Sequence, residues 1–136
     1  MINSVDHIAI AVKSLDDKIP FYRDILGLKF LGTEEVPSQK VKVAFFTVGD
    51  THIELLEPIS SESPIAAFLE KKGEGIHHIA YKVDDINKSI EEMKAKGLQM
   101  IDHTPRPGAH GNQIAFIHPK STFSVLTELC SKEDHK

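Results

Sequence analysis

Apolar and polar residues alternate along the chain in two similar blocks. Residues 5–12 are rich in Ile and Val and alternate loosely, a pattern that predicts a strand. After a polar break at Ser14, apolar residues recur at helical spacing as far as Gly27. The same succession of strand and helix starts again at Gly75, so the pattern indicates a structure built twice from one unit.

The first block predicts a strand, a helix and three further strands. Ser14 is the expected N-cap of the helix, with Asp17 three residues on, and Gly27 is the residue that ends it. Pro20 falls in the early turns, where proline is tolerated best. The remaining strands are expected over 28–33, 41–48 and 51–56, with a polar loop over 34–40 and a hairpin turn at Gly49 and Asp50.

The second block repeats this plan after a linker that carries a short helix starting at Pro64. Asp85 is expected to cap a helix that runs to Lys96 and ends at Gly97. Strands are expected over 76–83, 98–102, 112–117 and 123–130, with a Pro/Gly-rich loop over 103–111 and a polar tail from Ser131.

A shift of 71 residues places the two blocks on each other, with His7 on His78, Val12 on Val83 and Ala44 on Ala115. Repeated units that cannot each bury a core must pack together. The expected fold class is therefore α+β, with two tandem βαβββ modules that form one curved mixed sheet with a concave metal site. The 136 residues suit a single domain, 1–136, with module one at about 4–57, the linker helix at 58–75 and module two at 76–131.

Composition indicates the class of protein, its compartment and the partners that can be excluded. Apolar residues make up 40% and charged residues 26%, a balance typical of soluble globular proteins. No apolar run approaches the ~20 residues that span a bilayer, and no signal peptide is visible. Cys130 is the one cysteine, which excludes an internal disulfide and favours a reducing cytoplasm. The net charge of −4 argues against nucleic-acid binding.

Four polar residues stand at matching places in the two modules, His7 and Glu54 in the first and His78 and Glu128 in the second. An unpaired carboxylate would be costly in the middle of an apolar strand. Two imidazoles and two carboxylates suit a divalent ion such as Co²⁺, Ni²⁺, Zn²⁺ or Mn²⁺, with positions left for substrate. A single strand His or Glu is more often a packing or surface residue. A surface role gives no reason for the repeat, so we interpret the four as metal ligands.

The remaining candidates have plainer interpretations. His77 points to the strand face opposite to His78 and is expected to pack or to support the site. His52 shares a face with Glu54, although a surface role is slightly favoured. Cys130 is interpreted as a small buried hydrophobe. The other histidines, His103, His110, His118 and His135, fall in loops and the tail.

Several short segments carry a family resemblance. They are Asp6-His7-Ile8-Ala9, Glu54-Leu55-Leu56-Glu57-Pro58, Ser63-Pro64-Ile65-Ala66 with Phe68-Leu69, Gly75-Ile76-His77-His78-Ile79-Ala80, Gly108-Ala109-His110-Gly111, and His118-Pro119-Lys120-Ser121 with Val125-Leu126-Thr127-Glu128-Leu129. Over about residues 4–130 the chain resembles the vicinal oxygen chelate superfamily, the group of glyoxalase I, extradiol dioxygenases and fosfomycin-resistance proteins. Within it, the chain is most similar to the methylmalonyl-CoA epimerases, because the turn at His118 is theirs rather than the Asp-Pro-Asp/Asn-Gly turn of glyoxalase-type chains.

The resemblance implies a site and a reaction. The family's metal ligands carry onto His7, His78 and Glu128, and Glu54 stands where the family has Gln or Glu. The implied enzyme is an isomerase that epimerises methylmalonyl-CoA from 2R to 2S by proton abstraction through a metal-stabilised enolate, with Co²⁺ as the preferred metal. Glu128 and Glu54 are the candidates for proton transfer.

The resemblance also implies partners. An acyl-CoA substrate is expected, with no membrane or nucleic-acid partner, and the Pro105–Gly111 loop, Arg106, Lys120 and Ser121 are candidates for contact with the CoA portion. A cytoplasmic homodimer is expected, with Phe68 and Leu69 in the linker helix as contacts.

One departure leaves a catalytic role open. Some family members place an acidic residue on the third strand of module one as a base, whereas this chain has Val41-Lys42-Val43-Ala44-Phe45 there. The second proton carrier is therefore not identified by the resemblance. Alternative functions are a lactoylglutathione lyase of the glyoxalase I type, a metal-free small-molecule binding or resistance protein, and a dioxygenase, which the short chain disfavours.

Overall fold

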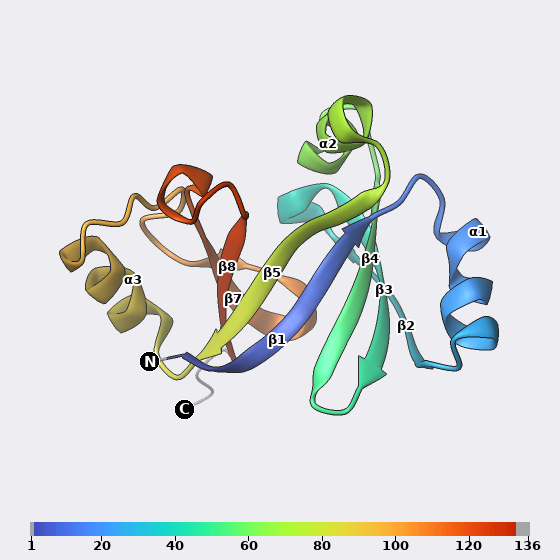
Figure 1. The fold of residues 1–136 in the computed structure, drawn as a ribbon, viewed down its shortest axis with the longest axis horizontal. Coiled ribbons are helices and arrows are strands. Elements are labelled where there is room, and N and C mark those ends of the chain that lie inside the picture. The colour runs from blue at the N-terminus through green and yellow to red at the C-terminus, as the bar shows by residue number, and fades with distance from the viewer. Residues whose placement is uncertain (1, 133–136) are drawn as a thin grey trace. The chain divides into compact units, whose positions relative to one another are not determined.

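The computed structural model describes residues 2–132, so positions 133–136, including His135 of the predicted tail, lie outside the described residues. The chain divides into two compact units (Figure 1). The first unit holds residues 7–77, and the second unit joins the residues before His7 to those from His78 onward. Within the described range, no helix has both the length and the apolar character needed to cross a bilayer.

The strands of the first unit follow the order β2-β3-β4-β1. β1 (Ile2–Ala11) enters this unit at His7 and runs parallel to β4 (Thr51–Pro58). β4 forms the predicted hairpin with β3 (Val41–Val48), and the turn contains Gly49 at a φ of 58°. One face of this sheet, the helix face, buries Ala44, Phe46 and Leu55 against Val12 and Leu15.

The helix on that face begins where the sequence predicts and then changes its winding. α1 (Leu15–Pro20) starts at Ser14, whose hydroxyl accepts the Asp17 N–H at 3.3 Å. It continues as a π-helical turn, η1 (Phe21–Ile25), in which the Leu26 N–H donates to the Phe21 carbonyl at 2.9 Å. Because Pro20 has no N–H, the α-helical ladder is broken there and the wider turn follows. Gly27 then ends the helix at a φ of 74°.

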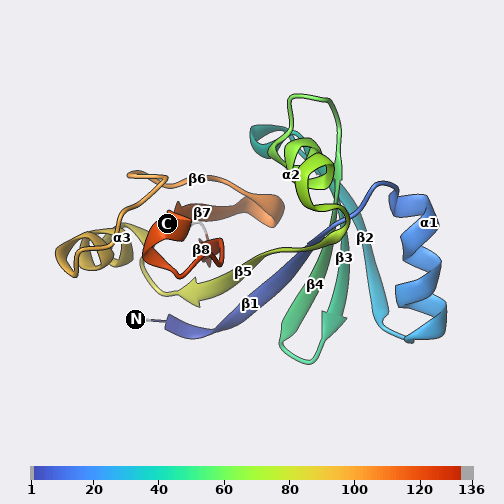
Figure 2. The ribbon, with the colours of Figure 1, turned by 45° about the horizontal axis from the view of Figure 1, so that its top comes forward.

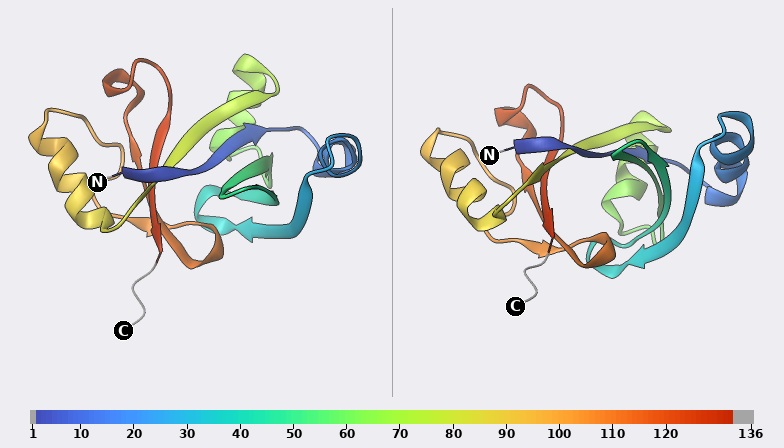
Figure 3. Two further views of the ribbon diagram at one scale, coloured as in Figure 1. Left: turned by 60° about the horizontal axis from the view of Figure 1, so that its bottom comes forward. Right: turned by 90° about the horizontal axis from the view of Figure 1, so that it is seen from below.

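β2 (Lys29–Val36) is the outer strand of the first unit, drawn in cyan in Figure 3. The prediction of a loop over 34–40 is wrong for its first residues, because Glu34–Val36 pair with Val41–Val43. The loop itself is the short 3₁₀ turn η2 (Pro37–Gln39). Edge strands often carry polar side chains, and these residues made this part of β2 look like a loop in the sequence.

β2 also contains a bulge. Phe30 pairs with Phe46 and Gly32 pairs with the next residue, Phe45, so Leu31 is the extra residue of the strand. Gly32 has a φ of 110°, a conformation that residues with side chains rarely adopt. Such a bulge changes which face of the sheet the following side chains occupy.

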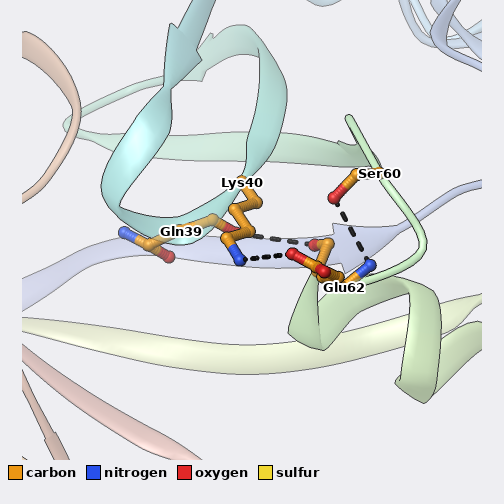
Figure 4. Close-up of polar contacts among 5 residues, drawn as sticks. Gln39, Lys40, Ser60 and Glu62 are labelled. Atoms are coloured by element: carbon orange, nitrogen blue, oxygen red, sulfur yellow. Dashed lines mark hydrogen bonds and ion pairs between the residues drawn. The ribbon is translucent and has the colours of Figure 1, made fainter.

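The linker helix is tied to the turn that follows β2 (Figure 4). α2 (Pro64–Lys72) begins at Ser63, whose hydroxyl accepts the Ile65 N–H at 3.2 Å and lies 3.5 Å from the Gln39 carbonyl. The Lys40 ammonium contacts the Glu62 carboxylate at 3.1 Å, and the Glu62 N–H donates to the Ser60 hydroxyl at 3.3 Å. These contacts hold the start of the predicted linker helix against the β2–β3 turn.

A second set of polar contacts connects the end of the linker to the start of α1. The Glu74 carboxylate accepts the Lys13 N–H at 2.8 Å and pairs with the Lys18 ammonium at 3.2 Å. The hydrogen bond from Lys13, helped by the charge of Lys18, lowers the pKa of Glu74 from its ordinary value. The ionised carboxylate therefore favours the folded chain.

The second unit has the same plan, with the strand order β1-β5-β8-β7-β6. β5 (Gly75–Val83) runs parallel to β8 (Thr127–Lys132), and β8 pairs antiparallel with β7 (Asn112–Ile117). β7 then pairs with a two-residue edge strand, β6 (Arg106–Pro107). The first residues of β1 belong here, and Asn3 donates to Asp84 at 2.7 Å.

α3 (Ile86–Ala95) covers one face of this sheet, as Figure 2 shows. Asp85 caps it by accepting the Lys88 N–H at 3.2 Å, and Gly97 follows it at a φ of 90°, both as predicted. Its buried stripe, Ile86 and Ile90, packs with other apolar side chains of the unit. That cluster also contains Val83, Met100, Ala115, Ile117 and Leu129, with Met93 and Leu98 at its edge.

Two strand predictions in this unit are wrong. Residues 98–102 form an isolated bridge between Met100 and Ile117 rather than a strand, and the edge strand is β6, inside the predicted Pro/Gly loop. The last strand starts at Thr127 rather than at 123, because Phe123 and Ser124 turn at φ values of 55° and 73°. β8 in turn includes Ser131 and Lys132, which the sequence placed in the tail.

Candidate functional site

The first unit holds one of the two predicted His–Glu pairs. His7 comes from β1 and Glu54 from β4, and His7 Nδ1 lies 3.2 Å from Glu54 Oε2. Both residues are buried, with 5% and 8% of their surfaces exposed. A carboxylate removed from water needs such a partner, so the pair explains how Glu54 is tolerated between Ile53 and Leu55.

The β-ladder fixes the surroundings of Glu54. Glu54 lies opposite Ala9 of β1 on one side and opposite Phe45 of β3 on the other. Side chains that face each other across a ladder share one face of the sheet. We call this side, opposite to the helix face, the glutamate face. Ala9 is a small residue, whereas Phe45 on the other side is large and 1% exposed.

The second unit holds the other pair on the corresponding strands, with the other imidazole nitrogen facing the carboxylate. His78 comes from β5 and Glu128 from β8, and His78 Nε2 lies 3.2 Å from Glu128 Oε1. They are 3% and 2% exposed. Glu128 lies opposite Ala80 of β5 and opposite Phe116 of β7.

The two ladders therefore match residue by residue under the repeat seen in the sequence. Ala9 and Ala80 are related by the same shift as His7 and His78, and so are Phe45 and Phe116. Each glutamate thus has a small residue on one side and a phenylalanine on the other. The phenylalanines were missed in the sequence, although the match of Ala44 with Ala115 placed them next in line.

Phe116 is part of a stack that the sequence did not reveal. The His78 ring meets the Phe116 ring edge to face, with centroids 5.2 Å apart. The Arg106 guanidinium lies over the same ring, 5.4 Å from its centre. Asp102 accepts the Phe116 N–H at 2.9 Å and lies 3.4 Å from Arg106 Nε. Arg106 was expected to contact substrate, and the structure also gives it this role in holding Phe116.

The other candidates fall where the strand pattern placed them. The His77 ring packs against Phe68 at 5.0 Å, as expected of a packing residue. His52 is half-buried and lies opposite His7 in the parallel ladder. Cys130 is buried and packs with Ile114 and Phe116, which confirms its interpretation as a small hydrophobe.

The loops expected to contact substrate are held in defined conformations. His118 caps the turn η4 (Pro119–Ser121), and its Nδ1 accepts the Lys120 N–H at 3.1 Å. Ser121 accepts the Gln99 N–H at 2.9 Å, so its hydroxyl has a structural partner. In the other loop, a Cβ on Gly108 would lie 2.8 Å from a methyl group of Ile114, so this glycine is needed for close packing.

The donor atoms present fit a divalent metal ion. Each pair offers one imidazole nitrogen and one carboxylate oxygen 3.2 Å apart. Two ligands bound to one ion at about 2.1 Å are separated by about 3 Å when the angle between them is near 90°. Nitrogen and oxygen donors together suit Zn²⁺, Co²⁺, Ni²⁺ or Mn²⁺. The chemistry and spacing of both pairs therefore agree with a role as metal ligands.

Comparison with known proteins supplies the family. A model of the glyoxalase/bleomycin resistance protein/dioxygenase superfamily matches residues 6–116. The chain belongs to this superfamily. The match covers most of the chain and confirms the resemblance inferred from its motifs.

Relatives within the superfamily are more specific. The ethylmalonyl-CoA/methylmalonyl-CoA epimerase of Cereibacter sphaeroides is 41% identical over 95% of this chain and 98% of its own length. The protein YqjC of Bacillus subtilis is 48% identical over 94% of this chain and 91% of its own. A methylmalonyl-CoA epimerase solved with methylmalonyl-CoA and NH4+ superposes with a TM-score of 0.94 at 35% identity, over 97% of this chain and 96% of that one. These superfamily members confirm the expected α+β fold of tandem βαβββ modules.

Proposed function

We propose that this chain is a metal-dependent isomerase that epimerises methylmalonyl-CoA at the carbon between the thioester and the carboxylate. The observation that carries the proposal is the pair of buried His–Glu contacts at repeat-equivalent places in a chain similar to epimerases. The substrate is proposed from the Cereibacter sphaeroides relative and from the structure solved with methylmalonyl-CoA.

His7, Glu54, His78 and Glu128 are the proposed ligands of one divalent ion. Neither pair alone fills the coordination of such an ion. Each offers one imidazole nitrogen, Nδ1 of His7 or Nε2 of His78, and one carboxylate oxygen at 3.2 Å from it. When bound, the ion supplies a Lewis acid that stabilises negative charge on the substrate oxygens as the proton leaves. Co²⁺ is the proposed metal, and metal analysis of purified protein tests that choice.

The chain's own residues orient the site and move the proton. Phe45 and Phe116 are buried and lie opposite the two carboxylates in their ladders, where we expect them to keep water from one side of each pair. Epimerisation needs one base to remove the proton and one acid on the opposite side of the carbon to return one. Glu128 is the proposed carrier on one side, and Glu54 is the candidate that the sequence offers for the other. The pantetheine and nucleotide portions are proposed to meet Arg106, Lys120, Ser121 and the Pro105–Gly111 loop.

Hydrogen exchange tests the proposal directly. Protein loaded with Co²⁺ is incubated with methylmalonyl-CoA in D₂O, and deuterium is followed at the carbon between the two carbonyls. We expect metal-dependent incorporation much faster than in a metal-free control, which is needed because the substrate exchanges slowly by itself. Incorporation at the control rate would contradict the epimerase, and the glutathione hemithioacetal of the glyoxalase I alternative would be the next substrate to try.

The cellular location and the oligomeric state expected from the sequence are proposals as well. A cytoplasmic homodimer is proposed, with Phe68 and Leu69 of α2 at the contact. Light scattering after size-exclusion chromatography measures the assembly. A monomer at micromolar concentration would overturn that part alone.

A further inference from the structure

The glutamate face of the first unit carries a second carboxylate that the sequence placed in a loop. Glu34 lies in β2 directly opposite Val43 of β3, and Val43 lies opposite Leu56 of β4. Leu56 is two residues beyond Glu54, so all these side chains leave the same face of the sheet. Among the described residues of β2, β3 and β4, this face has two carboxylates, those of Glu34 and Glu54.

The bulge in β2 is what places Glu34 there. Phe30 belongs to the helix face, where its ring lies 5.2 Å from Phe46. In a regular strand Glu34, four residues on, would share that face. The extra residue at Leu31 reverses the alternation, and Gly32 makes the bulge possible with its φ of 110°. Bulges are common next to active sites, where they re-aim a side chain.

Position and reach agree with a role in the reaction. β2 and β4 are two strand spacings apart, and Glu34 is offset from Glu54 by two residues along the ladder, so their Cα atoms are separated by about 12 Å. Two extended glutamate side chains that lean toward each other leave a space of a few ångströms, about the width of a small acyl group. A half-buried carboxylate at this distance can reach a substrate held at the His7–Glu54 pair.

The position of Glu34 also bears on the missing acidic residue of the third strand of module one, noted in the sequence. β3 presents Val41, Val43 and Phe45 to this face, so it supplies no acid. Glu34 is directly across the ladder from Val43, and opposite side chains in a ladder lie about 5 Å apart at Cβ. A carboxylate on β2 can thus occupy space next to that which an acid on β3 would fill.

We propose that Glu34 is the second proton carrier of the epimerisation, in addition to the carrier proposed at Glu128. The proposal rests on the function proposed above. In one direction the Glu34 carboxylate takes the proton from the carbon between the two carbonyls, and the C–H electron pair forms the enolate. The other carrier, for which Glu128 is proposed, then gives the proton of its carboxylic acid to the same carbon. The reverse direction exchanges these roles, so no other reactant is consumed.

The test separates proton removal from inversion. Each enantiomer of methylmalonyl-CoA is incubated in D₂O with metal-loaded wild type or with Glu34→Gln. Deuterium at the reacting carbon and appearance of the opposite enantiomer are measured separately. We expect Glu34→Gln to lose inversion by about 100-fold or more, while one enantiomer still exchanges its proton through the remaining base. Metal content is expected to equal that of wild type.

Matched variants keep this result interpretable. Glu35→Gln removes the neighbouring carboxylate, which is exposed and lies on the opposite face of the same strand, and it is expected to invert substrate normally. Glu34→Asp keeps a carboxylate on a shorter stem and is expected to restore part of the inversion. Thermal unfolding of all three variants shows whether the fold is retained.

The contrary outcomes are distinct. Three results for Glu34→Gln would show that Glu34 is not the second carrier: inversion at the wild-type rate, loss of exchange from both enantiomers with the metal still bound, or loss of the metal. In each of these cases the proposed epimerase function is unaffected. If wild type itself neither exchanges nor inverts the substrate, the proposed function fails, and the role of Glu34 falls with it.

Discussion

Phe116 lies directly across the ladder from Glu128, and its ring meets the His78 imidazole at 5.2 Å. One buried side chain therefore meets the imidazole of the pair and lies across the ladder from its carboxylate. Residues that support metal ligands in this way change metal affinity by about 10–100-fold when they are replaced. Phe116 is thus expected to position the proposed ligands, with an effect on metal binding before any effect on stability.

Phe116→Leu is expected to weaken Co²⁺ binding by about 10-fold, because the imidazole loses the ring that fixes its orientation. Titration calorimetry and the visible absorption of bound Co²⁺ measure the change. Phe46→Leu is the control, since Phe46 is as deeply buried but faces Val12 and Leu15 on the helix face. Equal weakening of Co²⁺ binding in the two variants would mean that general loosening, and not orientation, is responsible.

His78→Ala is expected to lose metal and turnover, and its free energy of unfolding without metal is expected to fall by about 3–5 kcal/mol. The physical reason is that Glu128, at 2% exposure, loses the imidazole 3.2 Å away. Urea unfolding and metal analysis measure the two effects. His77→Ala serves for comparison, because His77 packs against Phe68 on the other side of β5. Normal metal content in His78→Ala would contradict the assigned ligand.

Gly32→Ala is expected to destabilise the protein by about 1–2 kcal/mol, because a Cβ is strained at a φ of 110° although no atom obstructs it. Gly75→Ala is the matched control, since Gly75 has open space around it and an ordinary φ. Denaturant unfolding measures both. A similar loss in the two variants would show that the bulge does not depend on glycine.

Phe123→Gly and Ser124→Gly are each expected to raise stability by up to about 1 kcal/mol. Both residues have left-handed φ values, and the Phe123 side chain is 95% exposed, so its removal costs little packing. The greater freedom of glycine in the unfolded chain offsets part of the gain. Val125→Gly, at an exposed neighbour without a left-handed φ, is expected to destabilise. A lower melting temperature in both turn variants would contradict the strain.

Glu74 gives an acid-dependent contribution to stability. Its pKa is lowered in the folded chain by the Lys13 hydrogen bond and by Lys18, so its contribution is present above the ordinary glutamate pKa and is lost as the pH falls through the lowered value. Glu74→Gln is therefore expected to unfold with a smaller difference in stability between about pH 7 and pH 3.5 than wild type. Glu70→Gln controls for net charge. If the stability of Glu74→Gln depended on pH as that of wild type does, Glu74 would not contribute to this pH dependence.

The sequence was most informative where the repeat and the alternation of side chains agree. His7, Glu54, His78 and Glu128 were predicted from matching positions, and the structure gives each pair the same neighbours in its ladder. The helix caps Ser14 and Asp85 and the helix start at Pro64 were predicted because their side chains and spacing are local signals. Metal coordination by the four residues stays a prediction.

The sequence was least informative at edges and turns. Glu34–Val36 were placed in a loop because an edge strand needs few apolar residues, and the bulge at Leu31 left no regular alternation to detect. The turn at Phe123 and Ser124 lacks the glycines that normally mark left-handed backbone, so the last strand was predicted too early. Arg106 on Phe116 depends on contacts between residues ten apart, for which no local pattern exists.

The single extra residue at Leu31 makes β2 serve two purposes that a regular strand could not combine. Up to Phe30 the strand is committed to the hydrophobic core, and from Gly32 onward its even-numbered side chains change sides. The residues up to Phe30 can therefore serve packing, while those from Gly32 onward can serve chemistry. Position 34 lies on the face opposite to the packed helix face, so in such a fold an acid can move between neighbouring strands while the backbone stays the same.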